Sequence, residues 1–268
     1  MRIWVWQRPS RAGSVPNKVL YDEAMADIFD DLAAEYRQLD AALESLTPEQ
    51  WAHPSAAAGW TVSDVVLHLA QTEEAVTGQS ITAGTAFLPS TGTTVDGLAD
   101  EMVAAERGMP PADLLARWRK AAFATPDALR AHPPGTRLSW VRTPLSPRTL
   151  ATTRIAEHWA HALDITLPLG VAYPDTARLR HVAWLAHRTL QYAFAVEGLP
   201  DAPVCCELTA PDGARWTFGD PDAPNRITGL ASEFCRVGAR RLAPEQTGLT
   251  AEGPRAADAL RVVRNYAA

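Results

Sequence analysis

Three side chains in two short stretches of the sequence have the types and spacing of a metal site. Glu157 and His161 are four residues apart. If they lie on a helix, their side chains rise from one face with Cβ atoms roughly 5–6 Å apart. A carboxylate and one imidazole leave a divalent ion under-coordinated, so His68, on a separate expected helix, is the natural third ligand. Three protein ligands leave one position open for chemistry, whereas structural zinc sites usually have four.

Each of the three residues also has an ordinary structural interpretation. Glu157 fits a solvated helix position and His161 a half-buried histidine bonded to a carbonyl group, because such pairs often arise by chance. A lone histidine on an apolar helix face, such as His68, is more often a satisfied core residue. His158 competes with Glu157, since it lies three residues before His161 and could share a helix face with it. We expect His158 instead to make a supporting hydrogen bond or to pack beside Trp159.

A cationic cluster near the C-terminus is the second candidate for chemistry. Arg240 and Arg241 are adjacent, and Arg236 lies about one helical turn earlier. The ordinary interpretation is a solvated face near a helix C-terminus, where the helix dipole stabilises positive charge. The functional interpretation is a clamp for a substrate carboxylate, because a guanidinium group binds carboxylates through two parallel hydrogen bonds. Spacing alone favours the ordinary interpretation.

Two expected helices must position the three metal-ligand candidates. Thr61 followed by Asp64 is typical of a helix N-terminus, and the apolar pattern continues to about residue 78, which places His68 in mid-helix. A serine–proline pair opens a second helix over about residues 148–167, and this helix carries the other two candidates. The site therefore requires these two helices to face each other.

The rest of the pattern predicts a mainly α protein whose character changes near Gly198. Further helices are expected over about residues 21–45, 98–107, 111–124, 176–196, 230–241 and 256–265, with a short capped turn at 47–53. Strands at 204–210 and 215–218 flank a turn signal and are expected to form a hairpin, and a short strand is expected near 247–251. We expect a loose extension over residues 1–18, a helical bundle over 19–198 and a small α+β C-terminal domain over 199–268.

The composition limits the classes of partner that the protein could bind. The formal net charge of −6 offers no basic field for a nucleic acid, and no apolar run approaches the ~18 residues that span a membrane. The N-terminus also lacks a signal-peptide pattern, so we expect a cytoplasmic protein. Three cysteines, two of them adjacent, do not resemble a disulfide framework and are expected to be reduced. Only two of the 25 basic residues are lysines, which indicates a GC-rich, actinobacterial-type genome.

The sequence resembles a known family at the residues singled out above. The matching motifs are Trp51, Pro54-Ser55, Gly59-Trp60-Thr61-Val62-Ser63-Asp64, His68-Leu69, and Glu157-x-x-x-His161 followed by Asp164. Together they look like the metal-binding pattern of the DinB-like superfamily, and most like the mycothiol-dependent maleylpyruvate isomerase family. The resemblance covers about residues 20–268, including the segments 227–241 and 253–267.

This resemblance implies a DinB-like four-helix bundle in which His68, Glu157 and His161 hold a divalent metal, typically zinc. It also implies mycothiol, a low-molecular-weight thiol, as cosubstrate, and a C-terminal arginine, matching Arg240 or Arg241, that helps to hold an anionic substrate. The segment after these arginines and the region 78–110 depart from the isomerase pattern, so the substrate of the isomerase does not transfer directly. Three hypotheses follow.

The first hypothesis is a metal-dependent isomerase or thiol S-transferase acting on a small electrophilic substrate. A metal with an open position favours the thiolate, which is the nucleophilic form of a thiol. The second is a thiol-independent, metal-dependent hydrolase or cyclase of specialised metabolism. The third is a non-catalytic bundle that binds a small molecule or partner. The sequence leaves a homodimer open, and it leaves the metal open because Fe(II), Ni(II) and Mn(II) accept similar ligands.

Overall fold

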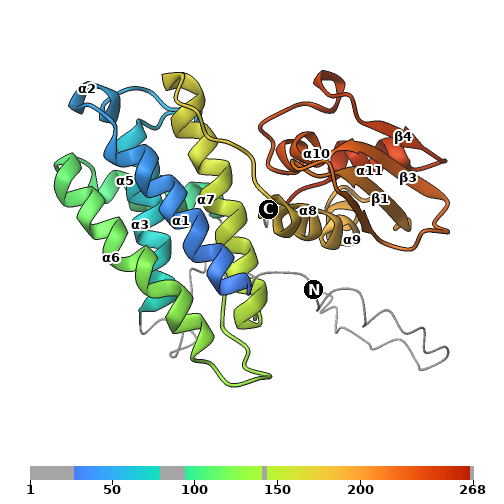
Figure 1. Cartoon of the computed structure of the whole chain (residues 1–268), viewed down its shortest axis with the longest axis horizontal. Coiled ribbons are helices and arrows are strands. Elements are labelled where there is room, and N and C mark those ends of the chain that lie inside the picture. The colour runs from blue at the N-terminus through green and yellow to red at the C-terminus, as the bar shows by residue number, and fades with distance from the viewer. Residues whose placement is uncertain (1–26, 79–93, 141–143, 266–268) are drawn as a thin grey trace.

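Four long helices, all of which end before residue 170, pack around one apolar core (Figure 1). They are α1 (Ile28–Glu44), α3 (Val62–Thr77), α6 (Pro111–Arg130) and α7 (Pro147–Leu169). The short α2 (Pro48–Trp51) precedes α3, and α5 (Val95–Glu106) packs against it. The computed structural model describes residues 27–78, 94–140 and 144–265. The expected N-terminal extension, residues 1–18, lies outside these ranges. Residues 79–93, which follow α3, also lie outside them.

The bundle forms because each long helix carries a stripe of apolar residues on its inner face. Its most buried large side chains include Leu32, Leu39, Leu69, Trp118, Leu150 and Ile155, which come from all four helices. Burying a side chain of this size contributes about 1.5–3 kcal/mol each through the hydrophobic effect. The packing of these stripes brings α3 and α7, the helices that carry the metal-ligand candidates, against each other.

Specific residues fix the first turns of these two helices. The Thr61 hydroxyl accepts a hydrogen bond from the Asp64 backbone N–H, and the Asp64 carboxylate accepts one from the Thr61 backbone N–H, which forms a capping box at the start of α3. The Ser146 hydroxyl accepts from the Thr149 backbone N–H at the start of α7, with Pro147 in the first helical position. Both helices therefore begin where the sequence predicts.

Asp64→Ala is expected to lower the free energy of unfolding by about 1–2 kcal/mol. The change keeps the Thr61 N-cap but removes the other half of the capping box, the carboxylate that accepts from the Thr61 backbone N–H. It also removes the partner of Arg107, whose Nε donates to Asp64 Oδ1 at 2.9 Å. Urea denaturation measures the loss. Asp113→Ala is the matched control, because Asp113 lies exposed in the first turn of α6, which has no side-chain cap. Equal losses in the two variants would contradict the capping argument.

The C-terminal half contains a small mixed sheet and short helices. The strands are β1 (Val204–Thr209), β2 (Arg215–Phe218), β3 (Asn225–Leu230) and β4 (Thr250–Glu252), in the order β2-β1-β3-β4. β1 pairs antiparallel with β2 and parallel with β3, and β3 pairs antiparallel with β4. The helices are α8 (Leu179–Arg188), α9 (Leu190–Val196), α10 (Ala231–Gly238) and α11 (Ala256–Val262), with the 3-10 turn η1 (Pro244–Gln246).

The predicted fold class is confirmed, with corrections to three elements. The helix expected over 176–196 is two helices, because at Thr189 the side-chain hydroxyl bonds the Arg264 carbonyl and the chain turns. The helix expected to end at 124 continues to Arg130 through Pro126, held there by tertiary contacts. The strand β3 was not predicted, since its inward Asn225 breaks the apolar alternation. The hairpin of β1 and β2 is confirmed.

The division between bundle and C-terminal domain near Gly198 stays a proposal. Helix α8 packs both on α7 of the bundle and on α10 of the C-terminal half (Figure 1).

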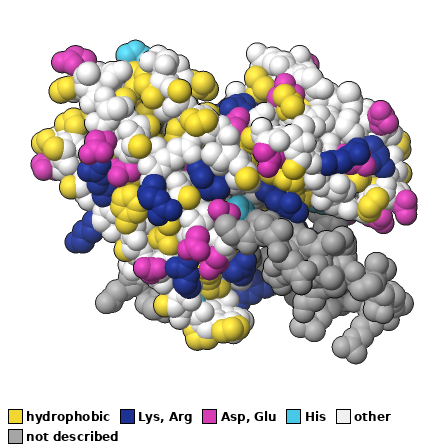
Figure 2. Space-filling view, in the orientation of Figure 1, with side chains coloured by type: hydrophobic (Ala, Val, Ile, Leu, Met, Phe, Trp, Pro, Cys, Tyr) yellow, Lys and Arg dark blue, Asp and Glu magenta, His cyan; other side chains and the backbone are white. Residues whose placement is uncertain are grey.

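Basic and acidic side chains are interspersed over the face shown in Figure 2, without a field of one sign. Within the described ranges, no helix combines the length and the apolar character that crossing a membrane requires.

Candidate metal centre

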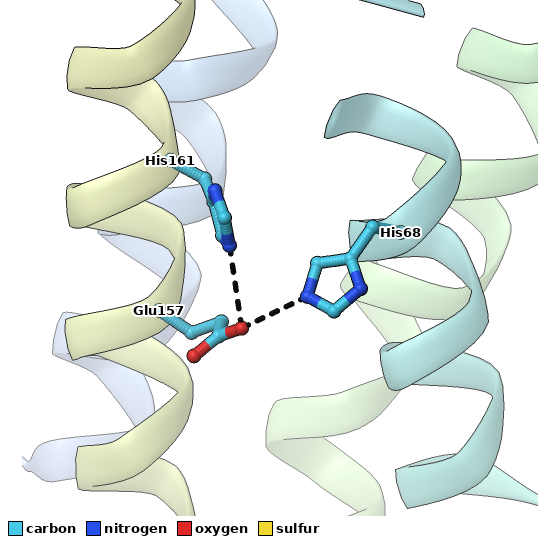
Figure 3. Close-up of side chains that lie close together, drawn as sticks. All are labelled: His68, Glu157 and His161. Carbon is cyan, nitrogen blue, oxygen red and sulfur yellow. Dashed lines mark hydrogen bonds and ion pairs between the residues drawn. The ribbon is translucent and has the colours of Figure 1, made fainter. Parts of the chain in front are cut away.

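His68, Glu157 and His161 converge between α3 and α7 (Figure 3). His68 Nε2 lies 3.0 Å and His161 Nε2 lies 3.4 Å from the same oxygen, Glu157 Oε1. One ligand atom from each residue lies within 4.8 Å of the other two. Over the part of the chain that the structure describes, this is the one group of three such side chains close enough to share an ion.

The cluster is electrostatically coupled because it is sheltered from solvent. Burial disfavours an imidazolium at His161, but hydrogen bonds to Asp164 and Glu157 outweigh it and raise the pKa of His161 to about 9. Burial likewise opposes the carboxylate of Glu157, but the two imidazoles hold its pKa well below its usual range. Burial lowers the pKa of His68 despite the neighbouring carboxylate. Glu157 is therefore an anion whose charge is balanced at neutral pH by the imidazolium of His161, and a bound cation would take over that positive charge.

Asp164 fixes the orientation of His161 and connects it to the C-terminal half. His161 Nδ1 donates to Asp164 Oδ2 at 2.9 Å, which leaves Nε2 directed at Glu157. Arg241 donates to both oxygens of the same carboxylate, with Nε to Oδ1 at 2.7 Å. The side chain of Asp164 is only 2% exposed. A carboxylate bonded to the distal nitrogen of a histidine is the usual support for a metal ligand.

Trp60 covers one side of the two imidazoles. Its ring centroid lies 5.1 Å from that of His68 and 6.3 Å from that of His161, with an interplanar angle of 21° to the second ring. The indole Nε1 donates to Asp100 on α5 at 2.8 Å, so the ring is tied down at its far edge. Gly59 precedes it with φ of +81°, a conformation that favours glycine. The indole therefore forms a fixed apolar wall beside the cluster.

The other candidates lie elsewhere. The Arg240 guanidinium donates to the carbonyls of Arg261 and Val262, and Arg236 pairs with Asp175 at 2.8 Å. His158 is fully buried and points into the bundle. Its Nδ1 donates to the Arg154 carbonyl at 3.0 Å, so it supports the core rather than joining the cluster.

Sequence reasoning left the roles of two site residues unassigned. Asp164 and Trp60 both belong to the motifs quoted for the family resemblance, but neither was given a function. The three-residue spacing between His161 and Asp164 was a usable signal, because such residues are neighbours on a helix face. No sequence signal could have placed Trp60, since its position depends on a loop and on the contact with α5.

Comparisons with known proteins identify relatives of this chain. The family described as the mycothiol maleylpyruvate isomerase N-terminal domain matches residues 32–166. Two uncharacterised proteins from two strains of Mycobacterium tuberculosis are each 36% identical over 241 residues, covering 88% of this chain and 94% of theirs.

Solved structures share the fold. The crystal structure of the mycothiol-dependent maleylpyruvate isomerase superposes with a TM-score of 0.59 at 16% identity, covering 85% of this chain and 95% of that one. A mutant of that enzyme gives a TM-score of 0.57 at 15% identity with the same coverage. Because the family's domain model matches half of the chain and the fold is shared over 85% of it, this chain belongs to the mycothiol-dependent maleylpyruvate isomerase family.

Proposed function

We propose that this protein is a divalent-metal-dependent enzyme that uses a mycothiol-like thiol as the nucleophile for isomerisation or S-transfer on a small electrophilic substrate. The observation that carries the proposal is the convergence of His68, Glu157 and His161 in a member of this family. The fold neighbours are described as mycothiol-dependent maleylpyruvate isomerase, which supports the thiol and the isomerase chemistry.

The residues present fit a metal, and we propose zinc. Two imidazole nitrogens and one carboxylate oxygen are a ligand set that zinc accepts, and three protein ligands leave room for a further one. Nδ1 of His161 is bonded to Asp164, which leaves Nε2 as the atom that would coordinate the ion. When bound, a divalent ion would supply positive charge that favours the thiolate form of a thiol held beside it.

The thiol is proposed to come from outside the chain. All three cysteines, Cys205, Cys206 and Cys235, are buried. Burial raises the pKa of each thiol, so none is poised as a thiolate at neutral pH. All three also belong to the C-terminal half, whereas the candidate metal ligands come from the bundle helices α3 and α7. A nucleophilic sulfur at the cluster therefore has to belong to a cosubstrate.

The chain's own side chains would then orient the reactants. Trp60 excludes water from one side of the cluster and offers an apolar face that suits a sulfur atom. Arg241 is proposed to attract the carboxylate of an anionic substrate, since it borders a shallow pocket that also includes Leu242 and Gln246. Arg240 borders the same pocket, but its guanidinium donates to the carbonyls of Arg261 and Val262. The Arg241 guanidinium donates to the Ala239 carbonyl and to Asp164, the partner of His161, which holds it next to the cluster. We therefore propose Arg241, and not Arg240, for this role.

The same thiolate supports two reactions. Addition to an activated cis double bond, rotation about the resulting single bond and elimination of the thiolate give the trans isomer and regenerate the thiol. Displacement of a leaving group instead joins the sulfur to the substrate carbon and releases the leaving group with its electron pair. The choice between them depends on the substrate.

Thiol-dependent turnover tests the proposal. Zinc-loaded protein is expected to convert at least one member of a panel of cis electrophilic acids, maleylpyruvate among them, to its trans isomer only when mycothiol is added, as followed by absorbance. Removal of the metal with a chelator is expected to abolish the reaction, and added zinc to restore it. Turnover at an equal rate without thiol would contradict the proposed nucleophile. Conversion of thiol into a stable adduct with a substrate that carries a leaving group would identify the transferase form.

A further inference from the structure

A charged pair is buried between α3 and α7 next to the ligand cluster. Arg154 Nε donates to Glu73 Oε1 at 2.6 Å, and the two side chains are 3% and 0% exposed. Arg154 Nη2 donates to the Thr72 hydroxyl at 2.7 Å. Thr125 of α6 donates to the other oxygen of Glu73 at 2.6 Å. Three bundle helices thus share one polar network inside an otherwise apolar core.

The network is held on its far side as well. Trp118 Nε1 donates to His158 Nε2 at 3.2 Å, and His158 in turn donates to the Arg154 carbonyl at 3.0 Å. The Tyr36 ring lies edge-on to His158 at 4.5 Å between centroids. Each of these side chains is fully buried or nearly so. Arg154 is therefore fixed both through its guanidinium and through its backbone.

The position of this pair relates it to the metal ligands. Thr72 lies four residues after His68 on α3, and Arg154 lies three residues before Glu157 on α7. Residues at these spacings share a helix face, one turn or about 5.4 Å apart. The Thr72–Arg154 hydrogen bond therefore lies one turn from the His68–Glu157 hydrogen bond. The later residue on α3 pairs with the earlier residue on α7, as expected of antiparallel helices. Figure 3 shows the turns of these two facing helices that carry His68, Glu157 and His161.

We infer that Glu73 and Arg154 are positioning residues for the metal centre, which fix the register of α3 against α7 and so hold His68 opposite Glu157 and His161. The inference rests on the proposed metal-binding function. A buried ion pair adds little stability relative to uncharged replacements, because desolvation offsets the attraction, and fixing register is its best-attested use. A slide of α3 along α7 would separate the ligands and break the two hydrogen bonds that cross between these helices, from Arg154 to Glu73 and from Arg154 to Thr72.

A matched pair of double variants tests this inference. E73Q/R154M removes both charges and keeps an acceptor for Thr125. E35Q/R178M makes the same change in the Glu35–Arg178 pair, which joins α1 to the residue before α8 at 2.7 Å. The other hydrogen bonds of this pair go to Tyr173 and Gln38, outside α3 and α7. The glutamine keeps an acceptor for the Tyr173 hydroxyl. Cobalt(II) dissociation constants and the cobalt absorption spectrum report the site, and circular dichroism reports folding.

The expected result is a cobalt(II) dissociation constant 10–100-fold higher in E73Q/R154M, with an altered spectrum, and a change within about twofold in E35Q/R178M. Equal affinity and spectrum in both variants and the wild type would overturn the inference. If E73Q/R154M does not fold, the cobalt(II) dissociation constant and spectrum of R154K are compared with those of the wild type instead. Lysine keeps the positive charge but cannot donate to Glu73 and Thr72 from one planar group, so the same rise is expected. No binding by the wild type would overturn the proposed metal site itself.

Discussion

Replacing His161 with alanine is expected to reduce bound metal from about one equivalent per chain to near zero. The change removes one of three ligands, and the remaining His68 and Glu157 leave a divalent ion under-coordinated. It also leaves Asp164 without the imidazole that it orients. Elemental mass spectrometry of protein purified without added metal or an affinity tag measures the metal content.

His53→Ala is the control for this experiment. His53 lies exposed before α3 and contacts the Pro54 carbonyl through Nδ1, so its loss should leave the metal content unchanged. Thiol-dependent turnover should disappear together with the metal in His161→Ala and persist in the control. Equal or negligible metal in all three proteins would remove the metal site and leave a small-molecule-binding bundle as the better description.

Arg241→Met is expected to lower kcat/KM at least tenfold and up to about a hundredfold. Hydrogen bonds to a charged partner contribute about 1.5–3 kcal/mol, and each 1.4 kcal/mol corresponds to a factor of ten. The variant loses the proposed attraction for an anionic substrate and strips the nearly buried Asp164 of a two-point partner. Steady-state kinetics with a carboxylate-bearing substrate gives the ratio.

Arg240→Met separates the two adjacent arginines. Its guanidinium bonds backbone carbonyls of Arg261 and Val262, so kcat/KM should stay within about threefold of the wild type. A larger loss in Arg240→Met than in Arg241→Met would contradict the assignment. Loss of metal in Arg241→Met would show that the arginine acts through Asp164 and His161, whereas a raised KM with metal retained would show substrate binding.

Sequence patterns predicted the bundle because its determinants are local. Helix caps such as Thr61 with Asp64, and apolar stripes with a period near four residues, specify α3 and α7 without knowledge of the fold. The four-residue spacing of Glu157 and His161 is likewise a local property. The third ligand, His68, is 89 residues away from Glu157, so ligand chemistry only suggested the pairing, and the family resemblance then supported it.

The parts that sequence patterns missed depend on long-range contacts. Strand β3 pairs with β1 and β4, and only these neighbours make its short, partly polar segment a strand. The break at Thr189 depends on the Arg264 carbonyl, 75 residues away. The Glu73–Arg154 pair joins residues 81 apart and has no motif that would reveal it. Burial and partners of charged residues emerge only once the helices are packed.

The long sequence separation between Arg241 and Asp164 bears on the order in which the site can form during synthesis. The Asp164 carboxylate bonds two residues of the site, His161 and Arg241. His161 is 3 residues away in the sequence, whereas Arg241 is 77 residues away. A chain still on the ribosome has all three proposed ligands long before the arginine emerges. The bundle can therefore form first, and the carboxylate that orients His161 gains its second partner only when the last part of the polypeptide folds against it.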